Sequence, residues 1–214
     1  LQEQEISTRA TIKRRLKDQT LPVKCRLCNN QDETVFHVLG SCSSLSSNMY
    51  TTSRHDAVGK VILQEIIDDN HQKFIKSPPP VTNTTTKEIW WNLQIKTTNK
   101  VKYNRPDIIV WDKETQVCSV IEVGVPLDFN VTNRQITKVD KYMPLVSELQ
   151  QMYPEYKYQI VPIIIGLLVA IPKQLKDSLT KLQVEEKRIQ AVTKKLQKSA
   201  VFGSVKTMKT FMKM

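Results

Sequence analysis

The 214-residue sequence contains no run of about 18 consecutive apolar residues, the length that a membrane-spanning helix requires. It also shows no signal peptide and no internal repeat. The longest apolar segment, residues 160–171, holds a proline and a glycine and predicts a buried central strand of a sheet. We therefore expect neither a membrane partner nor a secreted protein.

Cysteine and histidine are scarce, with four cysteines and three histidines in the chain. Three of these cysteines and one histidine fall within 18 residues, in the pattern C-x2-C-x8-H-x4-C. That spacing predicts a zinc site, and a complete set of four ligands leaves no position for water, so the ion is expected to be structural. Free buried thiols are the alternative. The predicted zinc ligands are Cys25, Cys28, His37 and Cys42.

Composition also bounds the compartment and the partner. Cysteines that are grouped for a metal and otherwise unpaired indicate a reducing compartment, so we expect a nuclear or cytoplasmic protein. The fourth cysteine, Cys118, lies in an apolar run and predicts a small core residue. The net charge of +11 and the pI near 9.5 favour a polyanionic partner. Nucleic acid is the first choice, and a membrane surface is the competitor.

Residues 104–125 place two acids on what we expect to be a hairpin. Pro106 precedes the β-branched run IIVW, KETQ makes a polar turn, and VCSVIEVGV resumes the strand pattern. Asp107 begins the first strand, and Glu122 lies deep in the second, where its carboxylate faces away from both apolar neighbours. A buried acid needs a partner, and metal-dependent nucleases of the restriction type supply one as a divalent cation. The alternative is a strand acid that faces solvent.

The lysine of the nuclease pattern PD-(D/E)xK is missing, because Gly124 stands two residues after the second acid. A helix is predicted over Val131 to Met152, with Asp128 or Asn130 as its N-cap. One face of that helix is expected to be apolar, and a basic stripe on the opposite face is expected to point toward the acids. A solvated basic face is the alternative. The apolar set is Ile136, Val139, Met143 and Val146, and the basic set is Arg134, Lys138 and Lys141.

Three segments carry a family resemblance, namely IEVGVPLDFNV, KVDKYMPLVSEL and VPIIIGLLVAIPKQL. They resemble the C-terminal endonuclease domain of non-LTR retrotransposons that encode a restriction-like endonuclease. The resemblance implies that Asp107 is the first acid, Glu122 the second, Lys138 the migrated lysine, and Lys141-Tyr142 the pair that follows it. The family more often has Asp at the second acidic position, and an acid where this chain has Thr137.

The resemblance extends to the Cys/His motif, which is similar to the zinc motif that precedes the endonuclease in the same family. Glu33-Thr34, Tyr50 and the tripeptide Arg54-His55-Asp56 also have counterparts there. A catalytic base is one interpretation of His55. We favour a role at the start of a helix, where its ring binds backbone or phosphate.

The activity that the resemblance implies is metal-dependent nicking of DNA, which supplies the primer for reverse transcription. Asp107 and Glu122, with a backbone carbonyl near Val123, would hold Mg²⁺ or Mn²⁺. Lys138 would orient water or stabilise charge on the phosphorane, while Lys141 and Tyr142 would contact phosphate.

The expected partners are DNA, element RNA, and the reverse-transcriptase part of a longer polyprotein. The chain itself has no polymerase motif. It is therefore either a fragment of such a polyprotein or a detached, domesticated endonuclease.

The predicted organisation has three parts: a basic N-terminal helix (1–19), a CCHC zinc module (20–56), and a restriction-like endonuclease domain with basic C-terminal helices (57–214). The expected fold class is α/β, with a mixed central sheet flanked by helices in the order helix, three strands, helix, strand, helix.

Within the third part, we expect a helix over 56–76, a linker over 77–86, and a first core strand that Trp90 and Trp91 open. Residues 173–214 predict one or two helices, on which Leu175, Leu179 and Leu182 face the core.

Several basic residues are candidates for nucleic-acid contact. They are Arg14, Arg15, Arg54, Lys102, Arg105 and Arg134. Two other functions compete with the nuclease. One is a nucleic-acid-binding module of the same fold without catalysis, and the other is a module for protein assembly.

Overall fold

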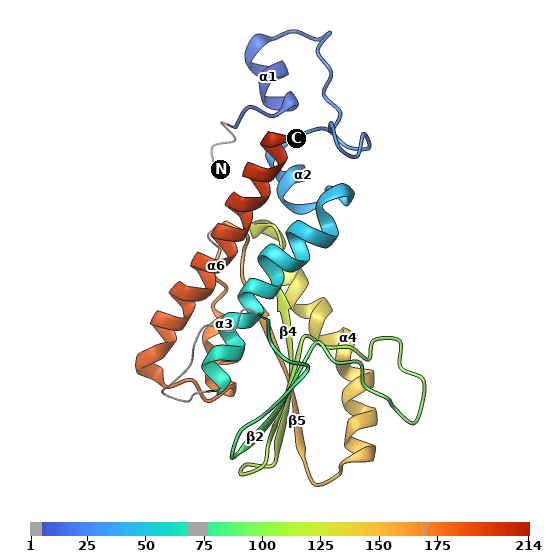
Figure 1. Ribbon diagram of the computed structural model, residues 1–214, viewed down its shortest axis with the longest axis vertical. Coiled ribbons are helices and arrows are strands. Elements are labelled where there is room, and N and C mark those ends of the chain that lie inside the picture. The colour runs from blue at the N-terminus through green and yellow to red at the C-terminus, as the bar shows by residue number, and fades with distance from the viewer. Residues whose placement is uncertain (1–5, 68–76, 169) are drawn as a thin grey trace.

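The computed structural model describes residues 6–67, 77–168 and 170–214, and its centre is a sheet of five strands in the order β1-β2-β3-β4-β5 (Figure 1). The first four strands pair antiparallel, and β4 and β5 run parallel. The strands are β1 (Val81–Asn83), β2 (Lys87–Trp91), β3 (Ile108–Asp112), β4 (Val117–Gly124) and β5 (Lys157–Ile164).

The hairpin of β3 and β4 forms as predicted. Ile108 pairs with Ile121, and Asp112 pairs with Val117. The turn between them is closed by Asp112 Oδ1, which accepts hydrogen bonds from the Glu114 and Thr115 amides. Because side chains alternate along a strand, this register fixes which residues share each face of the sheet.

Helices cover both faces of the sheet (Figure 1). On one face, Ile109, Trp111 and Val120 pack against α4 (Val131–Met152). On the other face, the alternate residues pack against α3 (Asp56–Ile67), α5 (Gln174–Lys181) and α6 (Glu186–Lys213). The parallel pair β4 and β5 is joined by α4, as a parallel connection requires. The expected mixed α/β class, with a sheet flanked by helices, is confirmed.

The N-terminal part contains α1 (Arg9–Leu16), α2 (Val35–Gly40), the 3-10 turn η1 (Ser43–Leu45) and the π-helix η2 (Ser46–His55), which leads directly into α3. Its apolar side chains share one cluster with the C-terminal helix, where Leu39 and Leu45 gather with Met208 and Phe211 of α6. A Cβ on Gly203 would lie 2.8 Å from the Arg54 Cα, so only glycine allows α6 to approach η2 this closely. The described N-terminal part and α6 therefore pack as one unit.

Some boundaries differ from the sequence-based expectations. The proline-rich segment 77–86 is not helical, as expected, but it contains the edge strand β1. Trp90 and Trp91 end β2 and do not open it. Residues 160–164 of the apolar run at 160–171 form the second half of β5, which lies at the edge of the sheet and not at its centre, and the rest of the run follows the strand. Helices on both faces bury it there.

The helices match the predictions more closely. The helix expected over 56–76 begins at Asp56 and extends to Ile67, while residues 68–76 lie outside the described part of the chain. Residues 173–214 form the two helices α5 and α6. The three leucines predicted to face the core are buried, and they are Leu175, Leu179 and Leu182.

Helix α4 has the predicted bounds, but the predicted apolar face was wrong at Ile136 and Met143, whereas Val146 packs against the core. Ile136 and Met143 are 59% and 57% exposed, whereas Tyr142, Leu145 and Leu149 are buried against the sheet. Toward the helix N-terminus this side of α4 carries the half-buried Lys138 and Lys141 before it reaches the buried Val131. The periodicity of apolar residues alone was therefore misleading, because polar groups occupy inward positions at that end.

Among the helices of the described ranges, none combines the length and the apolar character needed to cross a membrane.

Candidate metal centres

The four predicted zinc ligands converge, with their ligand atoms all within 4.8 Å of one another. Cys25 Sγ lies 3.9 Å from Cys42 Sγ, and Cys28 Sγ lies 3.3 Å from His37 Nε2. In a tetrahedral site with Zn–S bonds of about 2.3 Å, two sulfurs stand about 3.8 Å apart, so the sulfur spacing fits that ion. The cluster can hold a metal such as zinc.

Local hydrogen bonds aim the ligands of this cluster. Thr34 caps α2 by accepting a hydrogen bond from the His37 amide, which sets the helix that carries His37. His37 Nδ1 lies 2.9 Å from Gln31 Oε1, the outer contact that orients a metal-binding imidazole. Hydrogen bonds from the backbone amides of Asn30 and Gln31 lower the pKa of the Cys28 thiol.

The acid of this module, Glu33, is fully buried and fully paired. Its carboxylate accepts hydrogen bonds from the Arg9 amide, the Arg26 amide and the Arg26 guanidinium, at 2.7 to 3.0 Å. Burial alone would raise the pKa of Glu33, but these partners hold it below the ordinary value. Glu33 thus ties α1 to the Cys/His loop.

The second candidate centre lies at the end of the sheet where β3 begins and β4 ends. Asp107 Oδ2 accepts a hydrogen bond from the Val123 amide at 2.7 Å. Glu122 is 1% exposed, and its Oε2 accepts a bond from the Asp107 amide at 3.3 Å. The hairpin thus brings together the two predicted acids, both on the sheet face that α4 covers.

Helix α4 brings cations to this pair, as the helical spacing predicted. Lys138 Nζ lies 2.5 Å from Glu122 Oε1, and Lys141 Nζ lies 3.2 Å from the same oxygen. Tyr142 is buried, and its hydroxyl donates to the Arg105 carbonyl at 3.0 Å. Its ring and hydroxyl therefore support the turn before Asp107 and do not face solvent.

The pKa values of the two carboxylates are shifted in opposite directions. Burial and the neighbouring charge of Asp107 raise the pKa of Glu122, although Lys138 opposes that shift. Burial also disfavours ionised Asp107, but hydrogen bonding and charge from His55, together with Lys138, bring the pKa of Asp107 below its ordinary value. Perturbed carboxylates of this kind occur at functional sites as well as in structural ion-pair networks, and here three basic side chains, His55, Lys138 and Lys141, contact the pair.

His55 also reaches this site; the sequence analysis favoured a ring that binds backbone or phosphate over a catalytic base, and did not predict its contact with Asp107. Its Nε2 lies 3.1 Å from Asp107 Oδ2 and 3.2 Å from the Val123 carbonyl oxygen, and its Nδ1 lies 3.1 Å from Asp56 Oδ1. Burial lowers the pKa of His55, yet the bonds with Asp107 and Asp56 raise it to about 9. The expected position before a helix is correct, since η2 ends at His55 and α3 begins at Asp56.

Gly124 has a packing reason to lack a side chain. A Cβ built at Gly124 would lie 2.7 Å from Ile164 Cδ1 of β5. A lysine at the usual motif position would therefore require the tip of the Ile164 side chain to move. The cations that reach Glu122 come from α4 instead.

A cavity of about 280 Å³ adjoins the acid pair. Four basic side chains line it, and none of its lining residues is acidic. They are Arg54, His55, Arg134 and Lys138. This charge distribution suits an anion such as a phosphate group.

The other predicted nucleic-acid contacts are scattered. Arg14 and Arg15 are exposed on α1, at the far end of the N-terminal part. Lys102 and Arg105 are exposed on the loop before β3. Arg54, in contrast, is 3% exposed and donates to the Leu39 carbonyl at 2.7 Å, so it holds η2 against α2.

Tyr103 is a candidate that the sequence analysis missed. Its ring is 41% exposed and lies beside two lysines, with Lys141 Nζ 5.0 Å and Lys102 Nζ 5.2 Å from the ring centroid. An exposed aromatic ring among cations can stack on a base while the cations meet phosphate. The signal in the sequence that could have identified it is an aromatic residue within a basic loop.

The groups around Asp107 that could face an ion are oxygen donors, namely the carboxylates of Asp107 and Glu122 and the Val123 carbonyl. Mg²⁺ keeps several waters and takes one or two carboxylates, so a carboxylate, a second acid and a carbonyl are sufficient. Within the described residues, the Cys/His cluster is the one group of three or more Cys, His, Asp or Glu side chains placed to share an ion. An ion at Asp107 would therefore depend on the Val123 carbonyl and on water as well as on side chains.

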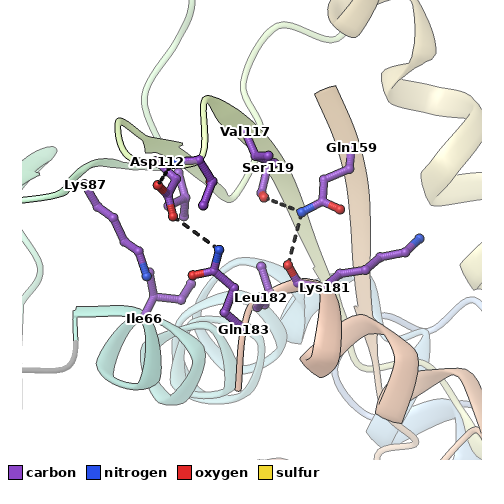
Figure 2. Close-up of a pocket in the computed structure, with 11 residues that line it drawn as sticks. Ile66, Lys87, Asp112, Val117, Ser119, Gln159, Lys181, Leu182 and Gln183 are labelled. Carbon is purple, nitrogen blue, oxygen red and sulfur yellow. Dashed lines mark hydrogen bonds between the residues drawn. The ribbon is translucent and has the colours of Figure 1, made fainter. Parts of the chain in front are cut away.

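A further cavity, of about 310 Å³, lies at the opposite end of the same strands (Figure 2). Its polar groups bond to one another: Gln159 donates to the Ser119 hydroxyl and to the Lys181 carbonyl, and Gln183 reaches Asp112. It offers no cluster of acids or metal ligands. The acid pair and the basic cavity lie at the other end of these strands.

No protein-family model matches the chain, and a search of curated proteins finds no match.

Proposed function

We propose that this chain is a metal-dependent DNA endonuclease with a restriction-like core, of the kind that non-LTR retrotransposons encode. One observation carries the proposal: Asp107 and Glu122, from adjacent strands, meet Lys138 from the following helix. These are the two acids and the migrated lysine that the resemblance implies. The strand order and the crossover helix α4 also suit a restriction-like core.

The catalytic roles follow from position and charge. Asp107, Glu122 and the Val123 carbonyl would hold Mg²⁺ or Mn²⁺, which when bound polarises the scissile phosphate and acidifies water. Lys138 is a positive group within 2.5 Å of Glu122, so it can orient water or meet the charge that develops on the phosphorane. Lys141 stands beside it and can contact a phosphate oxygen, while Tyr142 positions the turn before Asp107.

Substrate binding would use the acid-free cavity and the exposed loop beside it. Arg134 and Lys138 line the cavity, and Lys102, Tyr103 and Arg105 belong to the loop. These residues lie around the acid pair, so they can hold the strand on either side of the scissile bond. The Cys/His cluster would bind zinc as a structural ion, since its four ligands leave no open position.

The test is nicking of supercoiled plasmid by the zinc-loaded chain in Mg²⁺ or Mn²⁺. The wild type is expected to produce relaxed circles, and Asp107→Ala is not. Asp140→Ala is the matched control, because Asp140 is an exposed acid on α4, and it should nick as the wild type does. Equal nicking by the wild type and Asp107→Ala would refute the assignment.

A nucleic-acid-binding module without catalysis is the second candidate. It is favoured by the internal pairing of the site, where Lys138 and Lys141 already contact Glu122 and His55 contacts Asp107. Salt-sensitive DNA binding without nicking in either metal would establish that function. Salt-insensitive oligomers without DNA binding would instead point to protein assembly.

A further inference from the structure

Four aromatic rings line a cavity at the end of the sheet opposite the acid pair, which we call the aromatic cavity. Trp90 comes from β2 and Trp111 from β3, while Tyr153 and Tyr156 belong to the segment that joins α4 to β5 (Figure 1). Trp111 is central, since its ring centroid lies 5.4 Å from that of Trp90, 5.1 Å from that of Tyr153 and 5.0 Å from that of Tyr156. This cavity lies on the sheet face that α4 covers, whereas the cavity of Figure 2 lies on the other face.

The shape of the aromatic cavity suits a small ligand. The rings that meet at Trp111 are inclined at 60° to 82°, so they form adjoining walls and not a parallel stack. The cavity has a volume of about 310 Å³, at the lower end of the range of about 300–1,000 Å³ for small-molecule sites. The face of an aromatic ring carries negative electrostatic potential, so a cavity with several aromatic walls attracts a cation.

Two carboxylates add to that negative potential. Glu88 and Glu155 line the aromatic cavity, together with a single cation, Lys113. Glu88 Oε1 accepts a hydrogen bond from Trp90 Nε1 at 2.7 Å, which orients both side chains. Burial raises the pKa of the Tyr156 hydroxyl, and the neighbouring charges of Glu155 and Glu88 raise it further. The aromatic cavity is therefore locally acidic, in a chain whose net charge is +11.

The cations of the described part of the chain lie over other rings. The lysines and arginines that contact an aromatic face there do so at five rings outside the aromatic cavity, which are those of Tyr50, Tyr103, Tyr142, Phe202 and Phe211. The four rings of the aromatic cavity thus have no such partner among the described residues. A cation that binds to them would come from another molecule.

The chemistry of the walls selects the kind of cation. An unmodified lysine ammonium is strongly hydrated and needs hydrogen-bond acceptors for its three N–H groups. A trimethylammonium group has no N–H group and presents methyl groups to the ring faces, so aromatic walls can replace its weakly held water. Choline lipids carry this group next to a phosphate, which Glu88 and Glu155 would repel. A trimethylated lysine carries it without a phosphate, usually among other basic residues, which the same carboxylates attract.

We propose that the aromatic cavity binds the trimethylammonium group of a methylated lysine in a partner protein. The rings of Trp90, Trp111, Tyr153 and Tyr156 supply the cation–π contacts, and Glu88 and Glu155 supply the opposite charge. The aromatic cavity is separate from the acid pair, and the proposal does not depend on the nuclease function.

The test is proton NMR of a short peptide that contains one trimethyllysine, titrated with the zinc-loaded full chain. The trimethyl signal is expected to shift upfield on binding, because protons over aromatic faces are shielded. A peptide with the uncharged tert-butyl isostere has the same shape and should bind at least about 10-fold more weakly, since the cation–π attraction is lost. The peptide with unmodified lysine should also bind more weakly. These comparisons use the wild type alone, so they do not depend on any variant folding.

Variants locate the binding. Tyr153→Leu removes the most exposed of the four rings, at 37% exposure, and should weaken binding of the trimethyllysine peptide roughly 5-fold. Glu155→Gln should weaken it a few-fold, because one carboxylate is lost. Phe202→Leu is the matched control, at an exposed ring of α6, and should bind the peptide as the wild type does.

Three results would overturn the proposal. Equal affinities for trimethyllysine and its uncharged isostere would show that the rings make apolar contacts only. No upfield shift at millimolar peptide would show that the rings serve only to pack the sheet. Binding of phosphatidylcholine vesicles without binding of the peptide would assign the aromatic cavity to a lipid headgroup instead of a partner protein.

Discussion

Two glutamates in this chain are buried to the same degree, Glu33 in the Cys/His module and Glu122 at the end of the sheet, yet their surroundings shift the pKa in opposite directions. Hydrogen bonds and charge from Arg26, with the Arg9 amide, lower the pKa of Glu33. Burial and the charge of Asp107 raise the pKa of Glu122. Glu33 is satisfied by the folded chain, whereas Glu122 shares its site with a second acid.

The difference separates an acid that the folded chain satisfies from one that the proposed function assigns to the divalent cation. A buried carboxylate with an arginine and backbone amides contributes to stability. Two carboxylates in one buried place cost free energy, and folded proteins keep such arrangements mainly where a cation or a reaction uses them. Matched substitutions at the two positions are therefore expected to have opposite effects on activity and stability.

The largest effect is expected from Glu122→Gln. The neutral amide is a much weaker metal ligand, so nicking should fall on the order of 10³-fold. The free energy of unfolding should change by less than about 1 kcal/mol, because the substitution also removes the repulsion with Asp107. Plasmid nicking and thermal unfolding of the same preparation measure both. Unchanged nicking would contradict the catalytic role of Glu122.

Cys42→Ser should be next in size. Cys42 is buried among the four ligands, and loss of a structural metal unfolds the segment that the metal holds. We expect a loss of about 3 kcal/mol or more, which lowers Tm by roughly 10 °C. Cys118→Ala is the matched control, as a buried cysteine outside the cluster, and should cost about 1 kcal/mol. Equal Tm values for the two variants would contradict a structural metal.

Glu33→Gln should destabilise the chain by about 2 kcal/mol, because Arg26 loses its charged partner. After correction for the folded fraction, nicking should be unchanged, since Glu33 is not among the residues of the acid site. Glu155→Gln, at an exposed acid, is the control and should leave Tm in place. A large loss of nicking by folded Glu33→Gln would remove the distinction between the two acids.

The pH dependence of the free energy of unfolding should show the contribution of Glu33. The pKa of Glu33 is lowered on folding, so its carboxylate stabilises the chain above its unfolded pKa, about 4.3. That stability is lost as the pH falls through the lower folded pKa. As the pH is lowered from about 5 to the pH of acid unfolding, the Tm of the wild type should fall more steeply than the Tm of Glu33→Gln. Parallel curves would show that Glu33 contributes nothing.

The smallest effect is expected on the surface of α1. Arg14→Ala with Arg15→Ala should weaken DNA binding a few-fold and reduce the salt dependence, because each lost phosphate contact lowers the slope by about 1. Binding measured over a range of salt concentrations tests this. Lys194→Ala, an exposed residue of α6, is the control. An unchanged slope would exclude α1 from the DNA contact.

Local patterns predicted much of this molecule. The strand pair around Asp107 and Glu122, the bounds of α4 and the Cys/His cluster all follow from periodicity, turn residues or ligand spacing, which act over a few residues. The direction of the lysines on α4 also follows from helical geometry, because Lys138 and Lys141 are three residues apart.

The features that were missed depend on distant contacts. His55 meets Asp107 only because η2 and α3 cross the end of the sheet, and no local pattern encodes that approach. Ile136 is exposed because the face of α4 that packs on the sheet is the one that carries Tyr142. The close contact that a side chain at position 124 would make is with the tip of Ile164, in a strand 40 residues later in the chain.

The most direct test of the account concerns the ends of the nick. A hydrolytic nuclease that primes reverse transcription leaves a 3′-hydroxyl, so a DNA polymerase should incorporate labelled nucleotide at wild-type nicks without prior phosphatase treatment. Asp107→Asn should give no such incorporation. Nicks that need phosphatase before extension, or nicks of equal number and kind from Asp107→Asn, would contradict a hydrolytic site at Asp107.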